Sequence, residues 1–122
     1  MVVVSSVDDV RAPEAAASAA VVSILEKGKA VGNDLFKHQK HHEAIEEYSR
    51  TLAAYAAAVN GGGQTYDDDK DTQLLRAQIY TNRCIAFFNS GDYQKSVDDA
   101  TTCLSILPSH GKALYIFFLV SV

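Results

Sequence analysis

Four polar residues of this chain have the types and the spacing to bind an anionic group. Lys29 and Asn33 are four residues apart, which places both on one face of a helix, and Asn82 and Lys112 fall in two later helical segments. An ammonium group and a side-chain amide both donate hydrogen bonds, so together they can hold a carboxylate. Taken singly, each residue could equally be an ordinary solvated side chain, and the inference depends on all four converging.

A cluster of histidines is the first alternative site. The run HQKHH at 38–42 carries imidazoles that could bind zinc or copper. It falls at a predicted turn between two helices, where we expect His41 to pack and His38 and His42 to face water. We therefore predict no metal site.

The tract between the two helical regions lacks a complete ligand motif. Acids at Asp67, Asp69 and Asp71 resemble the start of a calcium loop, but Thr72 and Gln78 replace its glycine and its final glutamate. The triple glycine before them lacks the Gly-Lys-Ser/Thr ending of a phosphate loop. We expect no cofactor. We also expect no enzymatic activity, because no nucleophile, base and orienting group recur at a recognisable spacing.

The two cysteines, Cys84 and Cys103, fall on apolar faces of neighbouring helical patterns. Nothing else in the chain is typical of a secreted protein, so we expect reduced cysteines in the core. A disulfide across the helical hairpin is the alternative, because both residues lie near the seam between the helices.

The stretch 82–108 shows how the helices are organised. Two amphipathic patterns meet there at the polar turn Asn-Ser-Gly-Asp. Gly91 can end the first helix in a left-handed conformation, Asp92 is a good N-cap for the second, and Pro108 stops that helix. The stretch therefore predicts a helical hairpin.

The same unit occurs earlier in the chain. Shifting the sequence by 52 residues lays Phe36 on Phe88 and Ile45 on Val97, and neighbouring positions match in kind. A repeated helical hairpin that cannot bury its apolar stripe alone is typical of an α-solenoid. The offset exceeds one such repeat, which is explained if about residues 55–71 are an insertion whose flanks extend the neighbouring helices.

At these residues the chain resembles a tetratricopeptide repeat protein. The second unit offers that family's aromatic and small positions at Tyr80, Cys84, Phe87, Ser96, Ala100 and Pro108, and the first offers Gly28, Val31, Gly32, Leu35, Ala44 and Tyr48. The paired small positions are where the helices of a hairpin should touch.

The resemblance implies an all-α fold, an α-solenoid of stacked antiparallel helical hairpins with five helices in about two and a half repeats. The predicted boundaries are a disordered tail over 1–12 and a repeat domain over 13–122, with repeat one at about 25–58, repeat two at about 77–110 and a partial repeat three at 111–122.

Within that family, the co-chaperone branch binds peptides through a carboxylate clamp of Lys and Asn on the first helix, Asn on the third, and Lys and Arg on the fifth. The sequence is similar to this pattern at Lys29, Asn33, Asn82 and Lys112. The resemblance implies a co-chaperone-like adaptor that binds the acidic Glu-Glu-Val-Asp tail of seventy- and ninety-kilodalton heat-shock chaperones. The alternative is a scaffold that binds another peptide or helix without a working clamp.

The third repeat departs from the family pattern. Ile116 stands where the clamp has Arg, and a missing charge-assisted contact costs about 1.5 to 3 kcal/mol, or about ten- to a hundred-fold in affinity. The apolar run that follows ends before any partner helix. We expect a truncated third repeat and a surface that can self-associate through Phe117 and Phe118.

Bulk properties exclude other classes of protein. The 122 residues carry a net charge of −4, which argues against non-specific nucleic-acid binding. The first residues lack the basic start of a secretory signal, and no segment reaches the length of a membrane span. We expect a protein of the cytoplasm, with the nucleus as a further location.

Overall fold

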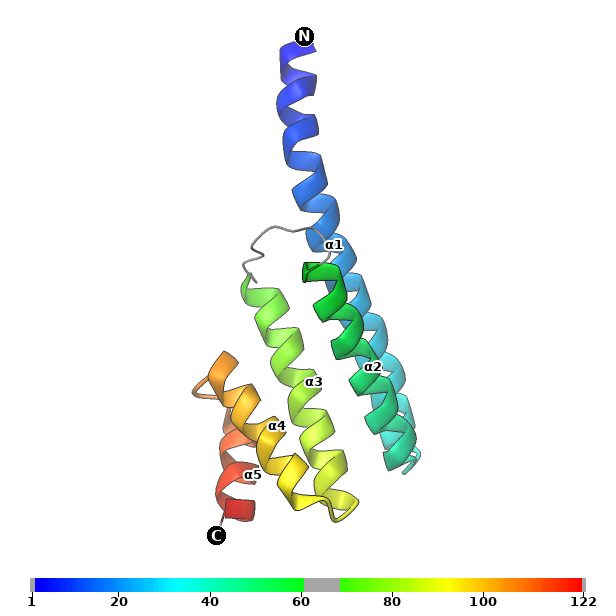
Figure 1. Ribbon diagram of the computed structural model, residues 1–122, viewed down its shortest axis with the longest axis vertical. Coiled ribbons are helices and arrows are strands. Elements are labelled where there is room, and N and C mark those ends of the chain that lie inside the picture. Colours follow the sequence, from blue (N-terminus) through cyan, green and yellow to red (C-terminus); the bar gives the residue numbers. More distant parts are fainter. Residues whose placement is uncertain (1, 61–68, 122) are drawn as a thin grey trace.

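The computed structural model describes residues 2–60 and 69–121, with the side chains of 19–60 and 69–119. These residues form five helices and no strand, as the sequence predicts (Figure 1). The helices are α1 (Val2–Lys37), α2 (His41–Asn60), α3 (Lys70–Asn89), α4 (Tyr93–Ile106) and α5 (Gly111–Ser121).

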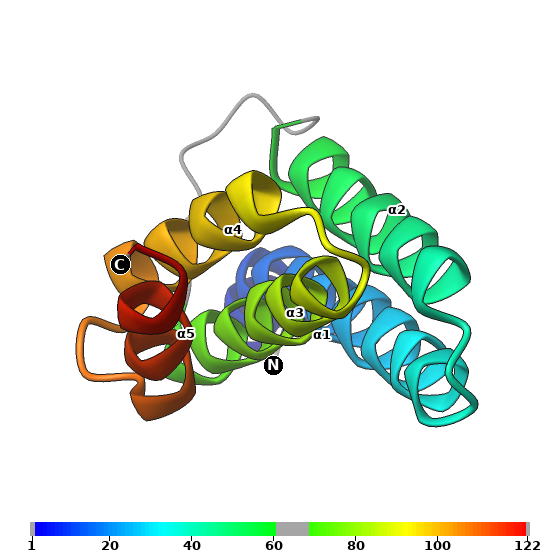
Figure 2. The same ribbon diagram turned by 90° about the horizontal axis from the view of Figure 1, so that it is seen from below.

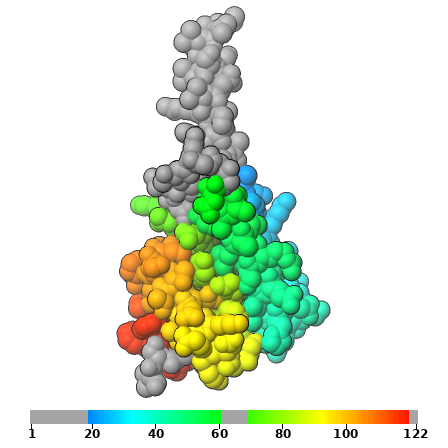
Figure 3. Space-filling view, in the orientation of Figure 1, coloured from blue at the N-terminus to red at the C-terminus, as the bar shows by residue number. Residues whose placement is uncertain are grey.

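The helices stack as antiparallel hairpins. The helices α1 and α2 form the first pair and α3 and α4 the second, and α3 also contacts α1, α2 and α5. Seen end-on, α1, α3 and α5 lie along one side of the molecule while α2 and α4 lie along the other (Figure 2). On the face drawn in Figure 3, α2 and α4 cover most of the coloured surface, and α3 shows between them and above α4. The predicted α-solenoid of helical hairpins is confirmed.

The turns of the two hairpins have the same backbone geometry. Gly91 has the predicted left-handed conformation, with φ of 83°, and Asp92 caps α4 through the backbone N–H of Lys95. In the first hairpin the left-handed residue is Gln39, with φ of 64°. The N–H of the next residue, Lys40, donates to a carbonyl of α1 at 2.9 Å, as Asp92 does to α3. Because position 39 is a glutamine and not a glycine, the sequence did not predict a left-handed residue there.

The first helix begins earlier than predicted. It starts at Val2, where we predicted a disordered tail over 1–12, and it contains Pro13 in its interior. Residues 2–12 include no glycine or proline, so no local signal ends the helix before Pro13. The predicted tail is therefore corrected to helix.

The predicted insertion extends the neighbouring helices on both sides. The helix α2 continues to Asn60, and α3 begins at Lys70 with Asp69 as its N-cap. The Asp69 carboxylate accepts a hydrogen bond from the N–H of Thr72 at 2.8 Å, and this contact lowers the pKa of Asp69. The triple glycine at 61–63 and Asp67 lie outside the described residues.

The small residues lie where the helices of each hairpin touch, as predicted. Gly32 packs against Tyr48, so closely that a Cβ on Gly32 would lie 2.2 Å from the tyrosine ring. In the second hairpin the Cys84 sulfur lies 3.2 Å from the Ser96 hydroxyl, and both residues are fully buried. Ala44, the counterpart of Ser96, is also fully buried.

The histidines at the first turn behave as the repeat predicts. His41 packs edge-on against Phe36 with ring centroids 5.1 Å apart, and the equivalent pair, Tyr93 and Phe88, is 5.3 Å apart. The other two histidines of the run, at 38 and 42, are exposed, as expected. Within the described residues, no group of three or more His, Cys, Asp or Glu side chains could hold a metal ion.

Both cysteines are free thiols in the core, which agrees with the prediction of reduced core cysteines. Burial raises the pKa of the Cys84 thiol to about 11 and also raises that of Cys103. Cys103 contacts the Thr81 hydroxyl at 3.1 Å. Both thiols therefore stay protonated near neutral pH and act as small apolar side chains.

The last helix has one buried face and one exposed apolar face. Ile116 is 8% exposed and packs with Cys84 and Ala100, so it points into the seam between α3 and α4. Tyr115 and Phe118 are 67% and 63% exposed. Among the helices of residues 2–60 and 69–121, none is long and apolar enough to span a bilayer.

Candidate functional site

Three of the four predicted binding residues come together between α1 and α3. The Asn82 amide of α3 donates to the Asn33 carbonyl oxygen of α1 at 2.7 Å. Four residues earlier on each helix, the Lys29 ammonium donates to the side-chain carbonyl of Gln78 at 2.6 Å. These two contacts fix the separation of the helices at the place where their polar faces meet.

Tyr48 of α2 supports this site from behind. Its hydroxyl donates to the same Asn33 oxygen at 2.5 Å. Burial raises the pKa of Tyr48 to about 12, although a hydrogen bond with Asn82 acts in the opposite direction, so the hydroxyl keeps its proton. Because two donors occupy the Asn33 oxygen, the orientation of that amide is set, and its –NH₂ end is the part that can face a ligand.

Two hollows lie along these residues, and we call them together the α1/α3 groove. The first has a volume of about 170 Å³ and is lined by Asn33, Phe36, Tyr48 and Asn82. The second has a volume of about 260 Å³ and is lined by Glu26, Lys29, Ala30, Asn33 and Leu75. Asn33 lines both, so the two hollows adjoin at this residue. The walls of the groove combine ammonium and amide donors with apolar surface.

The fourth predicted residue lies apart from this groove. Lys112 is in the first turn of α5, where it is exposed, and it lines neither hollow. The nearby Ile116, at the position where the clamp pattern has Arg, is turned into the helix seam. Among the described residues, the amide and ammonium donors that converge thus come from α1 and α3.

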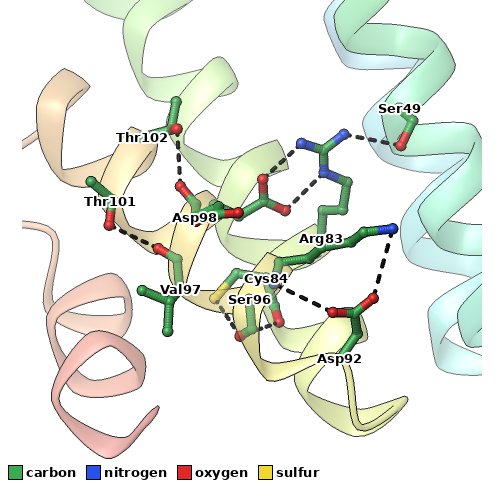
Figure 4. A network of polar contacts seen from close by, with 11 residues as sticks. Ser49, Arg83, Cys84, Asp92, Ser96, Val97, Asp98, Thr101 and Thr102 are labelled. Carbon is green, nitrogen blue, oxygen red and sulfur yellow. Dashed lines mark hydrogen bonds and ion pairs between the residues drawn. The ribbon is translucent and has the colours of Figure 1, made fainter. Parts of the chain in front are cut away.

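A largely buried ion pair joins the two helices of the second hairpin, and the sequence pattern did not predict it. The Arg83 guanidinium of α3 donates two hydrogen bonds to the Asp99 carboxylate of α4, at 2.8 and 2.7 Å. It also donates to the Ser49 hydroxyl of α2 at 3.0 Å (Figure 4). One side chain therefore links three helices, and it lies one residue after Asn82 of the groove.

Burial and pairing act in opposite directions on this ion pair. Burial raises the pKa of the Asp99 carboxyl, while the hydrogen bonds and charge of Arg83 pull it back. Burial disfavours the charged form of Arg83, but its contacts with Asp99 raise the pKa of the guanidinium overall. Two short hydrogen bonds in a fork geometry favour the ionised pair. The sequence showed that an Arg and an Asp lie on facing helices of one hairpin, but it did not identify them as an ion pair.

Comparison with known proteins places the chain among repeat proteins. No protein-family model matches it. The TPR repeat-containing thioredoxin TTL4 of Arabidopsis thaliana is 29% identical over 109 residues, which are 89% of this chain and 13% of that protein. Tetratricopeptide repeat protein 4 of Bos taurus is 31% identical over 83 residues, which are 68% of this chain and 18% of that protein. The chain thus spans less than a fifth of the length of these relatives.

A solved structure shares the fold. The C-terminal TPR-containing domain of a putative FK506-binding protein, PFL2275c, of Plasmodium falciparum has a TM-score of 0.72 and 23% sequence identity. The match covers 85% of this chain and 68% of that one. Two hairpins with equivalent contacts, relatives that carry the repeat and a shared solenoid fold identify the chain as a tetratricopeptide repeat protein.

Proposed function

We propose that the chain is a protein interaction module whose α1/α3 groove binds the acidic C-terminal tail of a chaperone. The tail would be the Glu-Glu-Val-Asp end of a seventy- or ninety-kilodalton heat-shock chaperone, and Lys29, Asn33, Asn82 and Lys112 would form a partial carboxylate clamp. The observation that carries the proposal is the Asn82 to Asn33 hydrogen bond, with Lys29 one helical turn away on α1.

The geometry of the groove suits a terminal carboxylate. The amide of Asn33 is oriented by Tyr48 and Asn82 before a ligand arrives, so little side-chain entropy is lost on binding. The Lys29 ammonium adds a charge-assisted donor. Phe36 and Leu75 supply apolar surface at the two hollows for the side chain next to the carboxylate.

The clamp is partial because α5 contributes less than the family pattern. Lys112 is exposed, and Ile116 is buried where that pattern has Arg. One charge-assisted contact fewer weakens binding by about ten- to a hundred-fold. A flexible tail also loses entropy when it is ordered, so we expect a dissociation constant in the micromolar range or weaker.

The proposal predicts that loss of either central donor weakens peptide binding. Lys29→Ala and Asn82→Ala should each raise the dissociation constant for a Glu-Glu-Val-Asp peptide by about ten- to a hundred-fold, because each removes a donor from a charged acceptor. Isothermal titration calorimetry measures the change. Lys27→Ala is the matched control, since Lys27 is an exposed lysine of the same helix that lines neither hollow.

The control should bind as the unchanged chain does. If the unchanged chain gives no binding heat and no NMR shifts at Asn33 and Asn82, the proposed function is wrong. If Lys29→Ala binds as tightly as Lys27→Ala, the peptide binds at another surface.

The exposed face of α5 favours a second candidate function. Tyr115, Phe118 and Leu119 share one side of the helix and are 67%, 63% and 48% exposed, and Phe117 packs edge-on beside Phe118. A scaffold that binds another helix, or a second copy of the chain, would use this face. Self-association would make the sedimentation coefficient rise with protein concentration. Loss of this dependence in Phe118→Ser, but not in Lys29→Ala, would support this function.

A further inference from the structure

Two polar contacts cross the α1/α3 groove in the same register. Lys29 contacts Gln78, and Asn33 contacts Asn82, with a sequence separation of 49 residues in each case. The partners are four residues apart on both helices. Successive turns of α1 therefore face successive turns of α3. Gln78 lies opposite Lys29 as Asn82 lies opposite Asn33.

Gln78 holds Lys29 without neutralising it. Its side-chain oxygen accepts one of the three N–H donors of the ammonium at 2.6 Å, which leaves two donors for a ligand. The amide is uncharged, and in the described part of the chain Lys29 forms no ion pair. The contact with Gln78 thus takes none of the positive charge of the lysine away from the groove.

The neighbourhood makes the neutrality of Gln78 important. Glu26 lines the same hollow as Lys29, so the groove already holds one carboxylate beside its lysine. A second carboxylate, at the position of Gln78, would be in direct contact with the ammonium and would compete with any acidic ligand. An apolar residue there would leave the lysine without the partner that orients it.

We propose that Gln78 is a specificity-determining residue of the groove: it orients Lys29 as a neutral acceptor and thereby selects ligands that bring their own carboxylate. This inference rests on the proposed function, and it adds a residue that the four predicted positions did not include. It also predicts the side from which a ligand reaches Lys29, because the ligand carboxylate must approach the two N–H groups that Gln78 leaves free.

The test compares three variants in calorimetric titrations with a Glu-Glu-Val-Asp peptide. Gln78→Glu keeps the size of the side chain and should weaken binding by about ten- to a hundred-fold, because the introduced carboxylate takes the place of the ligand at Lys29. Gln78→Met removes the acceptor without adding charge and should weaken binding by about threefold, since only orientation is lost. Gln94→Glu makes the same charge change at an exposed position of α4, away from the groove, and should leave the affinity unchanged.

Thermal unfolding of each variant accompanies the titrations, and Gln78→Glu should melt at or above the temperature of the unchanged chain. If the unchanged chain binds the peptide and Gln78→Glu binds it equally well, the role of Gln78 is overturned while the proposed function stands. An equal loss in Gln94→Glu would also overturn it, because net charge alone would then explain the effect. If the unchanged chain binds no peptide, the proposed function fails and the role of Gln78 fails with it.

Discussion

Replacing Asp99 by alanine is expected to lower the free energy of unfolding by about 3 to 5 kcal/mol. Asp99 is 4% exposed and accepts two hydrogen bonds from Arg83. Its removal leaves a partly buried guanidinium between helices, and in the described part of the chain the remaining polar partner from another helix is Ser49. For a domain of this size the loss is a large part of the total stability. Chemical denaturation followed by circular dichroism measures it.

The neighbouring residue Asp98 is the matched control. It is exposed, and its side chain accepts a surface hydrogen bond from Gln94, so Asp98→Ala should change stability by no more than about 0.5 kcal/mol. The double variant Arg83→Met with Asp99→Leu should regain much of the loss, because it removes both buried charges. An Asp99→Ala variant as stable as Asp98→Ala would show that the ion pair does not stabilise the second hairpin.

Replacing Gly32 by alanine is expected to destabilise the chain by about 2 to 3 kcal/mol, the upper part of the range for overpacked cores. An alanine inside a helix normally stabilises by up to about 1 kcal/mol relative to glycine, so the sign is reversed here. The reason is the Tyr48 ring, which would lie 2.2 Å from the new Cβ and is itself fully buried. The two helices of the first hairpin would have to move apart.

Gly111 provides the comparison for this change. It lies in the first turn of α5, and a Cβ placed there meets nothing within 4 Å. Gly111→Ala should therefore be neutral or slightly stabilising, as measured by the same denaturation. Because Tyr48 also orients Asn33, Gly32→Ala should weaken peptide binding too. Equal stability of the two alanine variants would contradict the packing of the first hairpin.

The sequence could predict the features that depend on short-range patterns. The helical hairpins follow from apolar periodicity, and the second turn follows from Gly91, which takes the left-handed conformation. The repeat predicted that His41 would pack as Tyr93 does, because the two positions are equivalent under the shift of 52 residues. The small residues at the helix seams were identified in the same way.

Features that depend on pairing between distant residues could not be predicted. Arg83 selects Asp99 and Ser49 across 16 and 34 residues. Asp99 shares the buried face of α4 with Ser96 and Cys103, but that pattern does not show which basic residue it pairs with. Gln78 was missed for a similar reason, since its role depends on the register of α1 against α3. The same register would have suggested it: once Asn33 is paired with Asn82, the residue four before Asn82 must face Lys29.

The polar faces of α1 and α3 could be predicted from the sequence, but the position of α5 relative to them could not. Lys29, Asn33 and Asn82 meet because helical spacing and the repeat fix which side of each helix they occupy. Lys112 and Ile116 are placed by how α5 packs against α3 and α4, and that packing turns Ile116 inward because its side chain is apolar. The position of α5 was therefore set by hydrophobic burial, which the clamp pattern does not describe.

The central claim is that the groove recognises a terminal carboxylate, and one paired titration tests it most directly. The chain is titrated with a Glu-Glu-Val-Asp peptide and with the same peptide amidated at its C-terminus, followed by calorimetry and by the side-chain amide NMR signals of Asn33 and Asn82. The free acid should bind and shift both signals, while the amidated peptide should bind at least about tenfold more weakly. Equal affinity for the two peptides, or binding that leaves both asparagine signals unchanged, would contradict the claim.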